Sequence, residues 1–391
     1  MAKTLTELDP DRVRTARWEA RDTDLDTVMA KVRDLHAELG QDDAAAEEHP
    51  HPRNCVLNLV VGLGDKHRAE QCDKLVGNLA ASHPLRAILV HLHGGAGPGT
   101  LDAEITCEAH RLLDGTSVQR EQILLHVRGE VTRHLSSLVE PLLVADVPTY
   151  LWWSGRGRLD DATVRDVMSF CDVLVVDSAQ FEHPVGALLQ LAALASDPQA
   201  DIGVGDFRWG RLRPWRDAIG QFFAPADRQA LLGGIGEIDV TSAGTGGDSR
   251  VGAALLAGWA AHALGWRFGR VDPAGADGTD AVLDAGDGQE VRLRVRSVAN
   301  QRLHHGELLT VRIAGRSGRR AFTLLIERDP EGDGHAHVTI ELGNAPPLHQ
   351  RLTLPRIGDP DLLVHVLWAQ VRDPMFYGAL LAAMPLLEAL R

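Results

Sequence analysis

The sequence predicts an α/β N-terminal domain with a mixed sheet flanked by helices, plus an α+β C-terminal domain with an antiparallel meander. The chain has 391 residues, which is enough for two domains that each bury a core. Between residues 54 and 195, apolar strand-like runs alternate with helical patterns, as in a sheet covered by helices. From 279 to 354, successive strand patterns are separated only by turn residues. We therefore expect domains at 1–200 and 201–391.

The N-terminal domain is expected to contain a helix at 24–39, whose apolar residues form one stripe. The segment 41–53 is acidic and proline-bearing, so it is predicted to be a surface loop. The runs CVLNLVVGL and LRAILVHL then predict buried strands. Residues 101–109 alternate strictly between apolar and polar side chains, which predicts a strand with one exposed face.

The central stretch of the chain is LLVADVPTYLWWSG, residues 142–155. Proline cannot donate to a strand ladder, so the strand is predicted from Thr149 to Trp153. Trp152 and Trp153 are adjacent and point to opposite faces of that strand, so one can pack on a core while the other faces a second layer, a domain or a partner. The alternative is that both are core tryptophans of a buried strand. A buried indole N–H requires an acceptor, and Asp146 is a candidate.

The second domain opens with GDFRWGRLRPWRDAIGQFF, residues 205–223. Proline suits a first helical turn, so a helix is expected from Pro214 to Phe223, entered from an irregular loop. Tryptophan and arginine are typical of protein-interface hot spots. The segment is therefore a candidate partner interface, although it could equally hold the two domains together; the residues concerned are Trp209, Arg211, Arg213, Trp215 and Arg216.

The remaining elements are a strand at 236–242, a small-residue helix at 249–266, the antiparallel sheet at about 279–354, and two C-terminal helices. Those helices are predicted at about 359–372 and 374–390, separated by Asp373 and Pro374.

Composition excludes several functions. The formal charge of -14 argues against binding to nucleic acid or to an anionic membrane. The sequence has no apolar segment of spanning length, so we expect a cytoplasmic protein without a membrane partner. Its four cysteines are widely spaced and contain no CxxC pair, so neither a disulfide framework nor a zinc site is expected.

The sequence predicts no catalytic site, no cofactor site and no metal site. His91 and His93 share one strand face, but no third metal ligand is apparent nearby. The turn Gly244–Ser249 opens a helix and could present N–H groups to an anion, although a simple turn is the preferred interpretation. The candidate anion contacts are three arginines on one face of a strand: Arg292, Arg294 and Arg296. The alternative is a solvated face balanced by Glu290, Glu307 and Glu327.

The segments ADVPTYLWWSG (145–155) and GDFRWGRLRPWRDAIGQFF (205–223) resemble the two most distinctive segments of the glucose-6-phosphate dehydrogenase assembly protein family, OpcA. The strand sequences at 53–61 and 82–90 are also similar to that family. The resemblance implies a non-enzymatic protein of the oxidative pentose phosphate pathway that binds the dehydrogenase and promotes its active oligomer. It implies thioredoxin-linked control in the photosynthetic branch, which a chain without a CxxC pair does not support.

Two other classes remain open at this point. One is an enzyme or sensor for a sugar phosphate or nucleotide, which would use the Gly244–Ser249 turn and the Arg292–Arg296 strand. The other is a structural scaffold, which would co-purify with the dehydrogenase without changing its rate.

Overall fold

The computed structural model describes residues 13–41, 55–63, 84–93, 97–111, 117–154, 159–276, 278–329, 334–369 and 371–391, together with 72, 75, 76 and 79. The expected acidic loop lies outside these residues from position 42 onward. The chain forms two compact units. The first contains Met1–Val176 and Asp201–Gly203, and the second contains Asp177–Ala200 and Val204–Arg391. The helix α5 (Pro184–Ser196), which the sequence placed before the domain boundary, belongs to the second unit and packs on α11 (Pro374–Ala389) there.

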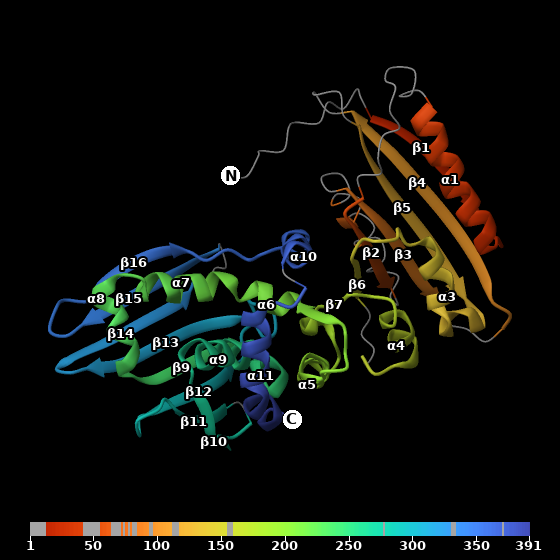
Figure 1. Ribbon diagram of the computed structural model, residues 1–391. Helices are drawn as coiled ribbons and strands as arrows, with labels where there is room; N and C mark the ends of the chain where they lie inside the picture. Colours follow the sequence, from red (N-terminus) through yellow and green to blue (C-terminus); the bar gives the residue numbers. More distant parts are fainter. Residues whose placement is uncertain are drawn as a thin grey trace. The chain divides into compact units, whose positions relative to one another are not determined.

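The strands β1 to β7 of the first unit belong to a mixed eight-stranded sheet in the order β1-β4-β5-β3-β2-β6-β7-β8 (Figure 1). Of the last strand, β8, only Gly203 is assigned to the first unit. The five neighbouring strands β5, β3, β2, β6 and β7 are parallel, while β4 and β1 form an antiparallel edge beside β5. The strands are β1 (Val13–Ala20), β2 (Leu57–Leu63), β3 (Leu85–His93), β4 (Thr100–Arg111), β5 (Ser117–Arg128), β6 (Thr149–Trp153), β7 (Val173–Val176) and β8 (Gly203–Asp206). The mixed α/β fold expected for this half is confirmed.

Helices accompany this sheet, and the first of them lies where the helix at 24–39 was expected. Helix α1 (Leu25–Gln41) packs against β1 and β4, and the first unit also contains α3 (Leu135–Val139) and α4 (Ala162–Met168). A continuous helix is not present where α3 lies, because short 3-10 turns η2 (Gly129–Arg133) and η3 (Glu140–Leu142) flank it. The central parallel strands are buried along their length, since β2, β6 and β7 contain only buried residues.

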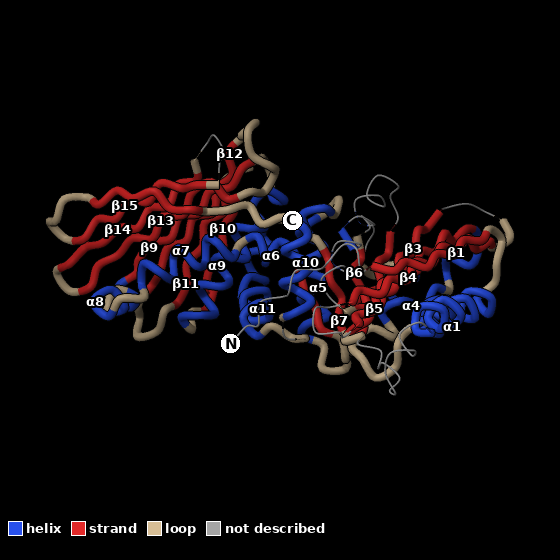
Figure 2. Tube along the Cα trace, turned by 90° about the horizontal axis from the view of Figure 1, so that it is seen from above, coloured by secondary structure: helices blue, strands red, loops and turns tan. Residues whose placement is uncertain are grey.

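The second unit is built on another eight-stranded sheet, in the order β10-β11-β12-β9-β13-β14-β15-β16 (Figure 2). All its pairs are antiparallel except β9 with β12, which are parallel. The strands are β9 (Ile235–Ala243), β10 (Arg267–Pro273), β11 (Gly278–Asp284), β12 (Glu290–Val298), β13 (Leu308–Ser317), β14 (Arg320–Arg328), β15 (His335–Leu342) and β16 (Leu348–Thr353). The meander is thus interrupted, because β9 inserts between β12 and β13.

The helices of the second unit include α6 (Phe207–Arg211), α7 (Arg213–Phe223), α8 (Ala226–Gln229), α9 (Val251–Leu264) and α10 (Asp359–Trp368). The prediction of an irregular loop before α7 is wrong, because residues 207–211 form the short helix α6. The side chain of Asp206 accepts a hydrogen bond from the Arg208 N–H and so caps α6. Asp206 is also the last residue of β8, so it is not recognisable as a helix cap from the sequence. Helix α9 packs along α11, and Figure 1 shows both beside the sheet.

Candidate functional site

Asp206 anchors the tryptophan- and arginine-rich segment of the second unit through hydrogen bonds. It is buried, and it accepts hydrogen bonds from the backbone N–H of Ser178 at 2.9 Å and from the Ser178 hydroxyl at 2.6 Å. Burial raises the pKa of Asp206, while the hydrogen bonds from Ser178 act in the opposite direction. These contacts hold the start of α6 against the η4 turn (Ser178–Gln180).

Trp209 connects three helices of the second unit. Its indole N–H donates to the Asp373 carboxylate at 3.0 Å, and its ring lies 5.7 Å from that of Phe376. The guanidinium of Arg216 stacks on the indole, 3.4 Å from its centroid. Burial lowers the pKa of Arg216 to about 10. Because Trp209 is only 4% exposed, it organises α6, α7 and the start of α11 instead of offering a free surface.

Arg211 and Trp215 also contact residues of their own unit. Arg211 makes a two-pronged ion pair with Asp177, at 2.6 and 2.9 Å, and a further hydrogen bond to Asp359 at 2.9 Å. Burial alone would lower the pKa of Arg211, but the two carboxylates outweigh it and the pKa is raised. Trp215 is buried, with the Arg328 guanidinium 5.5 Å from its ring.

Arg213 is the member of this segment that solvent reaches most freely. It pairs with Asp217 one helical turn later at 3.6 Å, and both side chains are more than half exposed. An exposed pair of this spacing stabilises a helix by only about 0.3–0.5 kcal/mol. Arg213 therefore has little structural role and is available to a partner.

Trp152 and Trp153 lie in the first unit, so the structure places them in a different unit from Trp209 and Trp215. Both indoles are buried on the expected strand β6, at 4% and 6% exposure. The Trp153 ring lies over Gly62 of β2, where a Cβ atom would be within 2.5 Å of it. Asp146 is exposed in a turn with φ of 61°, and among the described residues it accepts no hydrogen bond from either indole. The suggested role of Asp146 as indole acceptor is wrong.

The arginine row on β12 is present but paired. Arg292 pairs with Glu237, Arg294 with Asp239 at 3.3 Å, and Arg296 with Asp280 at 2.6 Å. The balancing carboxylates thus come from the neighbouring strands β9 and β11, and not from the three glutamates that the sequence suggested. Arg312 of β13 completes this network with Glu237 and Asp239. Paired in this way, the row offers little free positive charge to an anion.

The turn Gly244–Ser249 packs inside the second unit. A Cβ atom on Gly247 would lie 2.0 Å from the Leu390 carbonyl oxygen, so the turn abuts the end of α11. Asp248 accepts from the Val185 N–H at the start of α5, at 3.4 Å. Ser249 is fully buried, and its hydroxyl donates to the Gly246 carbonyl. These contacts give the turn a packing role.

A third histidine lies beside the two that the sequence singled out. His126 of β5 has a ring nitrogen 3.1 Å from His93, and its ring meets that of His91 edge-on at 4.8 Å. Burial first, and then His91, lowers the pKa of His126. Strand pairing of β3 with β5 brings His126 there, which spacing along the chain could not reveal. In the described part of the chain, however, no group of three metal-binding side chains is arranged to hold an ion.

None of the four cysteines forms a disulfide, and Cys72, Cys107 and Cys171 are buried. Burial raises the pKa of Cys107 to about 12 and also raises the pKa of Cys55 and Cys171. Since the thiolate is the reactive form, such thiols are poor nucleophiles at neutral pH.

We expect at most one thiol to react within minutes when the native protein is mixed with Ellman's reagent, and all four to react in denaturant. Dithiothreitol should leave the protein's binding properties unchanged. Rapid reaction of several thiols in the native state would contradict this account and would make redox control through the cysteines a reasonable hypothesis again.

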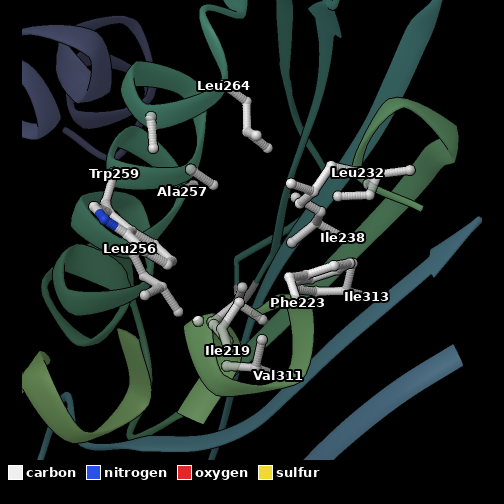
Figure 3. A pocket seen from close by; sticks show the side chains of 15 residues that line it. Ile219, Phe223, Leu232, Ile238, Leu256, Ala257, Trp259, Leu264, Val311 and Ile313 are labelled. Carbon is white, nitrogen blue, oxygen red and sulfur yellow. The ribbon is translucent and has the colours of Figure 1, made fainter. Parts of the chain in front are cut away.

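An apolar pocket of about 200 Å³ lies between α7, α9 and the sheet of the second unit (Figure 3). Its walls include Ile219 and Phe223 of α7, Trp259 of α9, and Val311 and Ile313 of β13. Figure 3 shows these side chains converging on the space. Because its lining is aliphatic and aromatic, the pocket suits an apolar group and supplies no acid, base or nucleophile.

Fold and site together define a two-unit protein, with a mixed α/β sheet in one unit and a tryptophan- and arginine-rich α+β second unit. None of the helices in the described ranges is long and apolar enough to cross a bilayer. Residues 76–193 match the model for the glucose-6-phosphate dehydrogenase subunit N-terminal domain, and residues 202–380 match the model for its C-terminal domain. The chain belongs to the OpcA family, the glucose-6-phosphate dehydrogenase assembly proteins of the oxidative pentose phosphate pathway.

Curated relatives carry the corresponding name. A Synechocystis protein named as the oxidative pentose phosphate cycle protein OpcA is 27% identical over 194 residues, or 49% of this chain and 39% of the relative. The protein of the same name from Nostoc punctiforme is 24% identical over 196 residues, covering 50% and 41%. The matched region thus spans about two fifths of each relative.

Among solved structures, the 3-ketoreductase KijD10 from Actinomadura kijaniata aligns with a TM-score of 0.46 at 12% identity, covering 86% of this chain and 97% of that one. We infer no activity from a likeness at this level.

Proposed function

We propose that this protein is a non-enzymatic assembly factor and allosteric activator, which binds glucose-6-phosphate dehydrogenase in the cytoplasm and promotes its active oligomer. The observation that carries the proposal is the match of both family domains, in order, over 76–193 and 202–380. The Trp209–Arg216 stack supports it, because the stack holds α7 in place and a preorganised docking helix loses less entropy on binding.

The mechanism follows from linkage. A partner shifts an oligomerisation equilibrium only by the difference between its affinities for the two forms. A tenfold preference for the active oligomer requires only about 1.4 kcal/mol of differential contact. The chain itself then needs no catalytic group.

The test is to separate the dehydrogenase into its oligomeric forms and to titrate each with fluorescently labelled protein. The proposal expects tighter binding to the active form. Equal affinity for both forms would rule out the mechanism, and binding without any change in rate would favour a scaffold.

We place the docking surface on the exposed side of α7, where Arg213 lies, with the buried indoles of Trp209 and Trp215 fixing that helix in position. The variant Arg213→Glu reverses a charge at the rim of this surface. It should weaken binding to the dehydrogenase by roughly threefold to tenfold, mainly by slowing association. The matched control is Arg270→Glu, since Arg270 is also exposed and paired with a neighbouring aspartate. Equal effects of the two variants would argue against α7 as the docking surface.

A further inference from the structure

A second pocket of the second unit, of about 490 Å³, is lined by arginines from distant parts of the chain. Arg208 and Arg211 come from α6, Arg328 from the end of β14, and Arg356 from the segment before α10. The loop His304–Leu308 closes another side. The volume falls within the range of about 300–1,000 Å³ that is usual for small-molecule sites.

Two of these arginines are neutralised by neighbouring carboxylates. Arg211 is held by Asp177 and Asp359, as described above. Arg356 makes a two-pronged ion pair with Glu307, at 2.6 and 3.1 Å. Their charges are therefore largely balanced within the protein.

Arg208 is different, because it is a buried cation without an ion pair. It is 6% exposed, and its Nε donates to the neutral hydroxyl of Ser178 at 3.0 Å. Among the described residues, no carboxylate lies within direct ion-pair distance of Arg208, and neither of its Nη groups has a described hydrogen-bond acceptor. The buried Asp206 carboxylate is reached only through the Ser178 hydroxyl, and Asp177 and Asp248 act on Arg208 from further away. Burying an unpaired charge is costly, and the cost disappears when an anion binds.

The surroundings of Arg208 leave room for such an anion. A Cβ atom on Gly306 would lie 3.1 Å from Nη1 of Arg208, and one on Gly252 would lie 3.8 Å away, so both glycines keep this end of the guanidinium uncovered. Gly306 has a φ of 81°, a conformation that favours glycine.

Arg328 supplies a second buried charge to the same pocket. Its Nε and Nη1 donate to the carbonyl oxygens of Leu308 and Leu354, at 3.3 and 3.1 Å. Its nearest carboxylate, Glu307, is 4.0 Å away and already binds Arg356. The pocket lining also includes Trp215 and Leu212, which suit the carbon body of a ligand.

We propose that this pocket is a binding site for a small phosphate monoester. Two incompletely balanced guanidiniums match the double negative charge of a phosphate group, and arginine is well suited to its geometry. The volume exceeds that of a phosphate ion alone, so the ligand carries a small organic body. This inference does not rest on the proposed function, because binding is a property of the isolated chain.

The test is calorimetric titration of the full chain with three probes: glucose 6-phosphate, glucose and inorganic phosphate. The expected result is saturable binding of glucose 6-phosphate, weaker binding of inorganic phosphate and none of glucose. If only inorganic phosphate bound, or if glucose bound as well as its phosphate, the proposal would be overturned. The absence of heat and of any thermal shift with all three probes would also overturn it.

The variant Arg208→Met should weaken glucose 6-phosphate binding at least about tenfold. The Tm of the free protein should change little, because the cost of the buried charge without a direct ion pair offsets the lost hydrogen bond to Ser178 and the lost charge near Asp206. The matched control Arg292→Met alters the paired row on β12 and should leave binding unchanged. Unchanged binding in Arg208→Met, or loss of binding in Arg292→Met, would overturn the assignment.

Hydrogen exchange of the wild-type protein provides a test that is independent of whether the variants fold. Glucose 6-phosphate should slow exchange in residues 304–308 and not in the β12 row. Protection at β12 alone would place the site elsewhere.

Discussion

Replacing Arg86 by methionine is expected to lower the free energy of unfolding of the first unit by about 3–5 kcal/mol, because the substitution removes the guanidinium that balances the buried Glu121 carboxylate. Arg86 and Glu121 are each 6% exposed and lie on the neighbouring strands β3 and β5. Arg86 donates from Nε to Glu121 at 2.5 Å and from Nη1 to the Leu142 carbonyl at 2.5 Å. His36 of α1 also contacts the Glu121 carboxylate.

The double variant Arg86→Met/Glu121→Leu separates the cost of an orphaned charge from the net value of the pair. Replacement of both buried partners by apolar residues is often nearly neutral, so the double variant should recover most of the lost stability. Urea denaturation followed by circular dichroism measures both effects. A single variant within about 1 kcal/mol of the wild type would show that Glu121 does not depend on Arg86.

Replacing Trp209 by alanine is expected to cost about 3–5 kcal/mol of stability in the second unit, because a large buried side chain is lost and a cavity remains. The variant also removes the surface on which Arg216 stacks and leaves Asp373 without the indole donor. Urea denaturation followed by circular dichroism also measures this loss. Because Arg216 lies on α7, the same change should reduce binding to the dehydrogenase.

The variant Trp209→Phe separates the contribution of the aromatic ring from that of the indole hydrogen bond. It keeps an aromatic face for Arg216 but loses the hydrogen bond to Asp373, so a loss of about 1–2 kcal/mol is expected. Trp259→Ala is the control, since that indole is only partly buried at the apolar pocket and should cost less. A loss for Trp209→Ala no larger than that for Trp259→Ala would contradict the central role of Trp209.

Local pattern predicted the strands with strong periodicity. The alternating run at 101–109 is the strand β4, with Ala103, Ile105 and Cys107 buried as expected. The strand Thr149–Trp153 and the start of helix α7 were also predictable, because a proline lies at the beginning of each element.

Elements that depend on distant partners were not predictable in this way. The edge strand β1 has a weak pattern, and its register is supplied by pairing with β4. The insertion of β9 between β12 and β13 pairs residues more than 50 positions apart, such as Arg294 with Asp239. That insertion determines the partners of the arginine row.

The arginine-lined pocket proposed to bind a phosphate monoester was likewise not predictable from local sequence. Arg208 lies in a segment that the sequence analysis singled out, but the absence of a direct ion pair for its guanidinium could not be read from neighbouring residues. Arg328 and the loop at 304–308 lie about 100 positions or more along the chain from Arg208. Their convergence depends on the folded sheet of the second unit.

The central claim is that this protein activates glucose-6-phosphate dehydrogenase by stabilising its active oligomer. The most direct test is a steady-state assay of the dehydrogenase from the same organism, with and without this protein, combined with light scattering of the mixture. The account predicts a higher rate together with a stable, larger complex. No complex and no change in rate at micromolar concentrations would contradict it.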